Sequence, residues 1–150
     1  MSYDDAGAPA LSIAIAIVDD EDSVRTGLRR LCSALGLHTT VYASGGEFID
    51  ALKNGAARPD CLLLDAHMPQ MSGLEVQRHL VMLGVRIPSI VYTADDAPEV
   101  KARYFAAGVA AYLCKPIAGD DLIAVIERVM TRPHPASVDQ SPTATPSRRL

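Results

Sequence analysis

The sequence has few cysteines and no excess of positive charge, and both features exclude classes of protein. Its three cysteines, Cys32, Cys61 and Cys114, have no C-x-x-C spacing, so neither a zinc site nor a disulfide framework is expected. Their apolar neighbours instead predict buried free thiols in a reducing cytosol. The formal net charge of −4 argues against a nucleic-acid surface, which usually needs a basic patch.

The sequence also has few of the signals that direct a chain into or across a membrane. No apolar stretch approaches the ~20 residues that a membrane span needs. Residues 1–9 are acidic and have neither the basic nor the apolar region of a signal peptide. We therefore expect a cytoplasmic location and no contact with a membrane.

Hydrophobic residues are plentiful: they make up 49% of the 150 positions, enough for one domain with a real core. The two ends of the chain have a different composition. We expect residues 1–11 to be a flexible N-terminus, residues 12–131 to form the folded domain, and residues 132–150 to be a disordered tail. The tail is rich in proline, serine and threonine and has almost nothing that a core could bury.

Five short apolar runs alternate with five segments whose apolar residues recur at helical spacing. The first run is rich in isoleucine, as is typical of a strand buried on both faces. Ser44 and Glu47 have the spacing of a capping box, which predicts the start of the second helix. We expect strands at residues 12–18, 38–42, 60–65, 88–92 and 110–114, and helices at 24–35, 45–52, 74–83, 97–107 and 121–130.

This alternation predicts an α/β fold, in which helices cover both faces of a parallel sheet through right-handed connections. Five strands in a doubly wound, flavodoxin-like (βα)5 sheet commonly take the order 2-1-3-4-5. That order places the ends of the first and third strands side by side. Those ends carry Asp19, Asp20 and Asp65.

Chemically useful groups stand at the ends of four of the five strands. Asp19 and Asp20 follow the first strand, Asp65 ends the third, Thr93 follows the fourth and Lys115 follows the fifth. Open α/β sheets bind ligands at this carboxyl edge. Taken singly, each residue has a plain explanation, since the acids could cap helices. The joint placement predicts a functional site.

Three carboxylates in one cleft repel one another, and without compensation at least one stays protonated. Mg²⁺ suits a site of a few carboxylates, a backbone carbonyl and waters. With Lys115 as a second positive charge, Asp65 could attack a phosphoryl group and form an acyl phosphate. The hydroxyl of Thr93 and the backbone N–H of Ala94 could each contact a phosphoryl oxygen.

The order and spacing of these groups resemble those of the receiver domains of two-component response regulators. The matching pieces are VDD at 18–20, LLDAHMPQMSG at 63–73, YTA at 92–94 and YLCKP at 112–116. They extend over residues 12–131, and the combination is highly specific. The segment at 44–48 and the loop around Pro69 resemble the FixJ-type subgroup.

The resemblance implies that Asp65 accepts a phosphoryl group from a phosphohistidine on a sensor histidine kinase or a phosphotransfer protein. Asp19 and Asp20 would bind Mg²⁺ together with Asp65 and the backbone carbonyl of His67. Lys115 would contact the phosphoryl group. Such a chain is not an enzyme, except that it catalyses its own Mg²⁺-dependent phosphorylation and dephosphorylation.

The resemblance also implies an output. Thr93 and Tyr112 would be a switch pair, in which Tyr112 rotates inward when the phosphate draws the Thr93 hydroxyl toward the cleft. The surface of the fourth helix, fifth strand and fifth helix would then change and control a downstream protein or drive formation of a homodimer. We expect Val100, Arg103 and Tyr104 to contribute to this patch.

Other interpretations stay open. The chain could be a stand-alone receiver without a DNA-binding domain, which the tail ending in residues 148–150 favours, or one domain of a longer regulator. A hydrolase with an aspartyl nucleophile would use His67 as its general acid or base, but the sequence has no inserted cap region. A scaffold without phosphorylation would not need all the key side chains. The resemblance further implies a cis Lys115–Pro116 bond.

Overall fold

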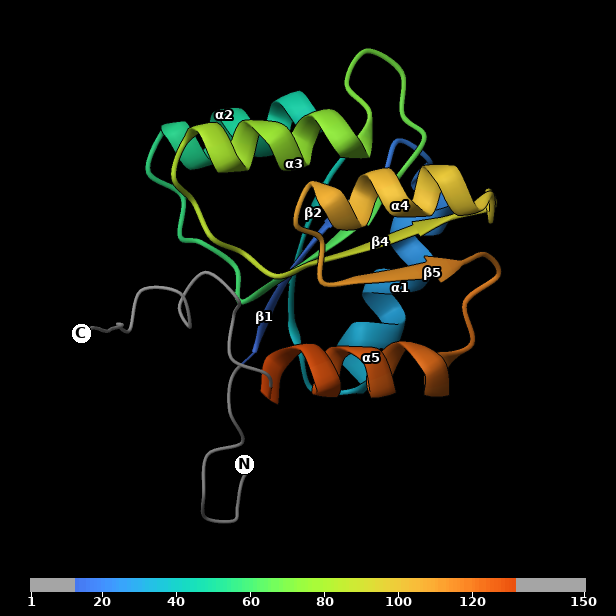
Figure 1. The fold of residues 1–150 in the computed structure, drawn as a ribbon. Helices are drawn as coiled ribbons and strands as arrows, with labels where there is room; N and C mark the ends of the chain where they lie inside the picture. Colours follow the sequence, from blue (N-terminus) through green and yellow to red (C-terminus); the bar gives the residue numbers. More distant parts are fainter. Residues whose placement is uncertain (1–12, 132–150) are drawn as a thin grey trace, which may run out of the picture.

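The computed structural model describes residues 13–131. The expected flexible N-terminus (1–11) and disordered tail (132–150) lie outside the described residues, so both stay predictions. The described residues form five strands and five helices in strict alternation, as the sequence predicts (Figure 1). Within this range, no helix combines the length and the apolar character that crossing a membrane requires.

The five strands form one parallel sheet in the order β2-β1-β3-β4-β5, which confirms the doubly wound, flavodoxin-like (βα)5 fold. The expected fourth strand was wrong by one residue at each end. Pro88 has no N–H for the ladder, although its carbonyl still accepts a hydrogen bond from Leu62 N at 2.9 Å. The strands are β1 (Ala14–Val18), β2 (His38–Tyr42), β3 (Cys61–Asp65), β4 (Ser89–Thr93) and β5 (Ala111–Cys114).

Side-chain hydrogen bonds at the helix starts explain where two of the helices begin. Ser72 and Glu75 form a complete capping box at the start of the third helix. At the second helix the expected box is only half formed: Ser44 Oγ accepts from Glu47 N, but the Glu47 carboxylate accepts from Ala43 N. The helices are α1 (Asp22–Ala34), α2 (Gly45–Lys53), α3 (Gly73–Met82), α4 (Pro98–Ala106) and α5 (Gly119–Thr131), within two residues of the expected bounds.

The sheet is the middle of three layers, with α1 and α5 on one face and α2, α3 and α4 on the other (Figure 1). Alternate residues of β1 show the division: Ile15 and Ile17 pack toward α1 and α5, whereas Ala16 and Val18 pack toward the other three helices. Both faces of the central strands are therefore apolar, which holds the carboxyl edge of the sheet on a rigid core.

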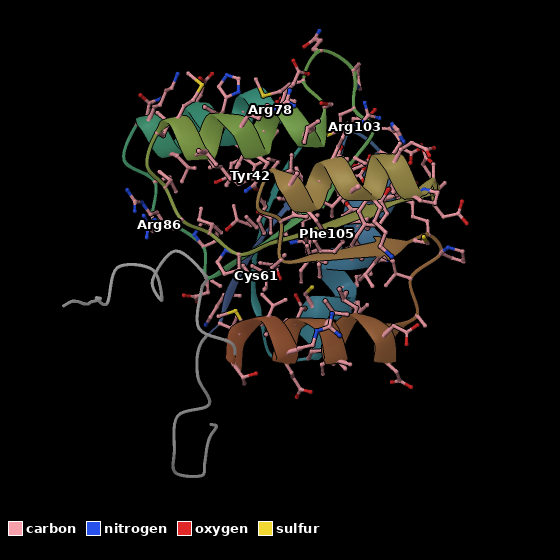
Figure 2. All side chains as sticks on the ribbon, in the orientation of Figure 1. Tyr42, Cys61, Arg78, Arg86, Arg103 and Phe105 are labelled. Carbon is pink, nitrogen blue, oxygen red and sulfur yellow. The ribbon has the colours of Figure 1, made fainter. Side chains whose placement is uncertain are left out.

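The cysteines are free thiols, as the sequence predicts, but only two of the three are buried. Burial raises the pKa of Cys32 to about 11 and that of Cys61 to about 12, so both stay protonated. Cys61 lies at the start of β3 (Figure 2). The expectation that Cys114 is buried was wrong: it ends β5, which is an edge strand, and its side chain is exposed.

Candidate functional site

The register of the sheet brings the strand-end residues to one edge. Asp65 ends β3 and is paired with Tyr92 on β4, one residue before Thr93. Asp19 follows Val18, which is the neighbour of Leu64 across the β1–β3 ladder. The acidic side chains at the ends of β1 and β3 therefore lie at the same edge of the sheet, as the sequence predicts.

Three carboxylates converge at this edge. Single carboxylate oxygens of Asp19, Asp20 and Asp65 all lie within 4.8 Å of one another. Asp19 is fully buried and Asp65 is 3% exposed, whereas Asp20 is open to solvent. The cluster therefore combines two buried acids with a third that solvent reaches.

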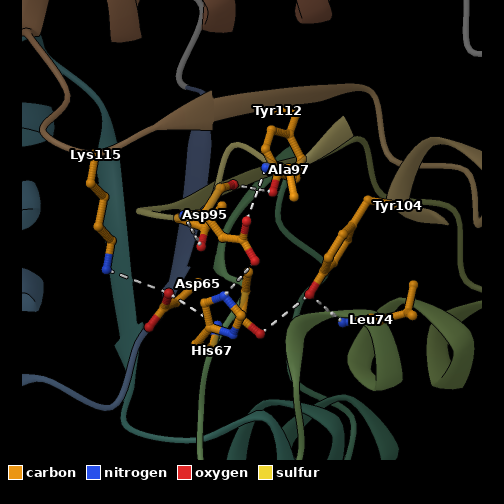
Figure 3. Close-up of polar contacts among 10 residues, drawn as sticks. Asp65, His67, Leu74, Asp95, Ala97, Tyr104, Tyr112 and Lys115 are labelled. Atoms are coloured by element: carbon orange, nitrogen blue, oxygen red, sulfur yellow. Dashed lines mark hydrogen bonds and ion pairs between the residues drawn. The ribbon is translucent and has the colours of Figure 1, made fainter. Parts of the chain in front are cut away.

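Lys115 provides a positive charge beside the cluster, and Figure 3 shows its amine pointing toward Asp65. Its Nζ lies 3.4 Å from Asp65 Oδ1 and 3.9 Å from Asp19 Oδ2. The residue directly follows β5, and its backbone N–H donates to the carbonyl of Thr93 at 2.7 Å. The Lys115–Pro116 peptide bond is cis, which confirms that prediction.

The surroundings of Asp65 favour its neutral form. Burial raises the pKa of the Asp65 carboxyl to about 6, and the negative charge of Asp19 adds to this effect. Lys115 and the backbone N–H of His67, which donates to Asp65 Oδ1 at 3.3 Å, act in the opposite direction. The site therefore holds more negative charge than one lysine compensates.

The donor set fits Mg²⁺. All three side chains offer hard carboxylate oxygens, and the raised pKa of Asp65 indicates that a further cation would be stabilised there. Within residues 13–131 this is the only group of at least three acidic, histidine or cysteine side chains close enough to share an ion. Asp19, Asp20 and Asp65 are the side chains that would hold the metal.

Asp95 connects Thr93 to Tyr112, a connection that the sequence did not reveal. The backbone N–H of Asp95 donates to Thr93 Oγ1 at 3.1 Å, and the Tyr112 hydroxyl donates to the Asp95 carbonyl at 2.6 Å (Figure 3). Thr93 is fully buried and Tyr112 is half-buried. The loop after β4 thus touches both members of the expected switch pair.

The two remaining site residues of the sequence prediction lie at the rim. Ala94 directly follows β4 and is exposed. His67 is also exposed, with Nε2 3.8 Å from Asp95 Oδ2, an ion pair only when the histidine is protonated. The backbone of His67 is held at the cleft by its N–H bond to Asp65.

Tyr104 does not belong to the exposed patch, contrary to the sequence expectation. It is 4% exposed, its hydroxyl donates to the Ala66 carbonyl at 3.2 Å, and that hydroxyl accepts from Leu74 N at 3.1 Å. The spacing of Val100 and Tyr104, four residues apart, could have indicated a shared inward face. Tyr104 instead connects the loop that follows Asp65 to the start of α3 through these two hydrogen bonds.

Other residues of α4 do reach the surface. Figure 2 shows Arg103 on the side of the helix nearer α3 and Phe105 on the side nearer β5. Phe105 is 44% exposed, an unusual fraction for a large apolar side chain. Lys101 Nζ lies 5.9 Å from the centre of the Tyr112 ring. The exposed side chains of α4 thus include Lys101, Arg103 and Phe105, and Tyr112 beside them on β5 is half-buried.

Comparison with known proteins identifies the class. The family described as "Response regulator receiver domain" matches residues 15–127, so the chain belongs to the receiver domains of response regulators. Receiver domains typically bind Mg²⁺ and interact with sensor histidine kinases and downstream effectors. The acidic cluster at the sheet edge is what this family membership leads one to expect.

Particular relatives refine this membership. The chain is 36% identical over 135 residues to the response regulator MprA of Mycobacterium sp. (strain KMS), covering 90% of this chain but only 58% of the relative. Two solved structures each align with 83% of the chain. One is a response regulator receiver protein from Burkholderia phymatum (38% identity, 99% of that chain, TM-score 0.72). The other is FixJ-N (30% identity, 98% of that chain, TM-score 0.74), in agreement with the FixJ-type resemblance.

Proposed function

We propose that this chain is a phosphorylation-controlled signalling switch whose phosphoacceptor is Asp65. The observation that carries the proposal is the position of the Asp65 carboxylate, 3.4 Å from the Lys115 amine and within 4.8 Å of the carboxylates of Asp19 and Asp20. A nucleophilic carboxylate between an amine and a cation-binding cluster is suited to accept a phosphoryl group.

In the proposed reaction an Asp65 oxygen forms a bond to the phosphorus of a phosphohistidine on a sensor kinase or phosphotransfer protein. The phosphorus–nitrogen bond breaks, and its electron pair stays on the imidazole. Mg²⁺, when bound by Asp19, Asp20, Asp65 and the carbonyl of His67, supplies positive charge to the phosphoryl oxygens. Lys115 supplies positive charge from the opposite side.

The output of the proposed switch passes through Asp95. The Thr93 hydroxyl, which accepts from Asp95 N, would donate to a phosphoryl oxygen and turn toward the cleft. The backbone N–H of Ala94 would also donate to the phosphoryl group. The loop then moves, the Tyr112–Asp95 bond at 2.6 Å breaks, and Tyr112 turns inward. Phosphorylation thereby shifts the populations of two conformations that differ in the surface formed by α4, β5 and α5.

The location and the partners of the chain are also proposed. We propose a cytoplasmic protein that binds no nucleic acid and catalyses only its own phosphorylation and dephosphorylation. Its output acts on a protein partner or on a second copy. The chain spans 58% of the length of its MprA relative.

Incubation with a small phosphodonor, with and without Mg²⁺, tests the proposed function. We expect one added phosphate per chain by intact mass, formed only with Mg²⁺ and lost slowly on removal of the donor. Turnover of many donor molecules would instead indicate a hydrolase, and absence of any phosphate would indicate a scaffold. Either of these results would overturn the proposal.

A further inference from the structure

A buried tyrosine, Tyr92, points its hydroxyl into the acidic cluster. Tyr92 lies on β4 one residue before Thr93, is 1% exposed, and packs in the core layer that faces α1 and α5. Its hydroxyl donates to Asp19 Oδ2 at 2.7 Å. A leucine or isoleucine would fill such a core position without needing a hydrogen-bond partner, so the phenol contributes more than packing.

The Asp19 carboxylate is fixed through both of its oxygens. Oδ1 accepts from the backbone N–H of Glu21 at 2.8 Å, and Oδ2 accepts from Tyr92. Arg25 Nη1 also donates to the Asp19 carbonyl at 2.7 Å, which holds the backbone. Each carboxylate oxygen keeps a lone pair that is not used by these bonds.

Tyr92 also contacts the cationic side of the cleft. Lys115 Nζ lies 5.1 Å from the centre of the Tyr92 ring and 3.9 Å from Asp19 Oδ2. A ring face at this distance attracts an ammonium group. One side chain therefore orients both an acid of the cluster and the amine opposite it.

The phenol is a permanent donor. Burial raises the pKa of Tyr92 above its usual range, and the adjacent Asp19 carboxylate raises it further. The neutral hydroxyl donates to a carboxylate oxygen of the fully buried Asp19. A neutral donor does this without competing with a metal for the negative charge.

We propose that Tyr92 is a positioning residue of the Mg²⁺ site: its hydroxyl fixes the Asp19 carboxylate so that the free lone pairs face Asp20 and Asp65. This inference rests on the proposed function, because it concerns the metal that phosphorylation needs. Hydrogen-bond partners of metal ligands typically contribute 10–100-fold to metal affinity. We expect Tyr92→Phe to weaken Mg²⁺ binding on the order of tenfold.

Calorimetric titration of the whole chain with Mg²⁺ tests the inference. Ser89→Ala is the matched control, because it removes another fully buried hydroxyl from the opposite end of the same strand, where Ser89 Oγ donates to Gln77 Oε1 at 3.0 Å. Ser89→Ala and Tyr92→Phe should both lower the melting temperature of the metal-free protein. Only Tyr92→Phe should change the dissociation constant for Mg²⁺.

A spectroscopic measurement on the wild type does not depend on whether any variant folds. The chain contains five tyrosines and no tryptophan, so the near-ultraviolet difference spectrum on adding Mg²⁺ reports mainly on tyrosine. We expect a tyrosine signal in the wild type and in Ser89→Ala, and a reduced one in Tyr92→Phe. Wild type that binds Mg²⁺ with no tyrosine signal, or Tyr92→Phe with unchanged affinity, would overturn the inference. Wild type that binds no Mg²⁺ would overturn the proposed function.

Discussion

The hydroxyl of Tyr112 donates to the backbone carbonyl of Asp95 at 2.6 Å, and this bond ties β5 to the loop that follows β4. The backbone N–H of Asp95 donates to Thr93 Oγ1. A change at the Thr93 hydroxyl can therefore reach Tyr112 through a single residue. This short connection is the structural basis of the proposed output.

Thr93→Ala should leave phosphorylation of the chain intact but uncouple it from association. Alanine keeps the buried position but cannot bond a phosphoryl oxygen or accept from Asp95 N. Light scattering of wild type and variant, each with and without a phosphoryl mimic, measures the association. Thr40→Ala, an exposed threonine on the opposite edge strand β2, is the control. Equal association in the wild type and Thr93→Ala, with and without the mimic, would exclude phosphorylation-dependent self-association through this face.

Asp65 should make the stability of the metal-free protein depend on pH. Its folded pKa of about 6 lies above the ordinary value of 3.8. The contribution of this carboxyl to the free energy of unfolding is therefore fully present below about pH 4 and is lost as the pH rises through 6. From pH 7.5 to pH 5, wild type should gain about 1 kcal/mol relative to Asp65→Asn, since one pKa unit corresponds to 1.36 kcal/mol. Urea unfolding in a chelator measures this gain, and parallel curves for the two proteins would contradict it.

Asp20→Ala should weaken Mg²⁺ binding by at least about tenfold and slow phosphorylation, because it removes the only exposed acid of the cluster. The metal-free protein should keep its stability or gain up to about 0.5 kcal/mol, since one source of repulsion is lost. Asp50→Ala, an exposed acid on α2, should change neither property. Calorimetry shows the difference, and equal Mg²⁺ affinities of Asp20→Ala and Asp50→Ala would exclude Asp20 as a ligand.

Gly73→Ala should destabilise the chain by about 1–3 kcal/mol, as overpacking typically does. A Cβ at Gly73 would lie 2.7 Å from the Asp65 carbonyl oxygen and 3.1 Å from Ala66 Cα, both of them backbone atoms. The variant should also accept phosphate more slowly, because the backbone of the phosphoacceptor must shift. Gly27→Ala is the control: nothing lies within 4 Å of its Cβ in α1, and it should stabilise the helix by about 0.5–1 kcal/mol. Equal melting temperatures of the two variants would contradict the packing argument.

The periodicity of the sequence was enough to predict the fold and the convergence of the strand-end groups. Apolar runs define parallel strands, and parallel strands place whatever follows them at one edge. The partners of individual side chains were not predictable in this way. Asp95 acts through its backbone N–H and carbonyl, which its residue type does not reveal. Tyr92 occupies an ordinary core position, and only the three-dimensional structure shows that its hydroxyl reaches Asp19.

Exposure was also difficult to predict at the edges of elements. Cys114 sits in an apolar run, yet the edge position of β5 leaves it open to solvent. Tyr104 has the polar hydroxyl of a surface residue, yet it is buried because the carbonyl of Ala66 after β3 and the N–H of Leu74 in the first turn of α3 satisfy that hydroxyl. In both cases the tertiary neighbours, rather than the local pattern, decide the outcome.

Locating the phosphate tests the central claim most directly. An acyl phosphate on an aspartate is reduced by borohydride to homoserine, which tandem mass spectrometry can assign to one position. After treatment with a small phosphodonor and Mg²⁺, we expect homoserine at position 65 in wild type and no phosphate on Asp65→Asn, because an amide is not a nucleophile. A phosphate on another residue, or one retained by Asp65→Asn, would contradict the assignment of Asp65 as the phosphoacceptor.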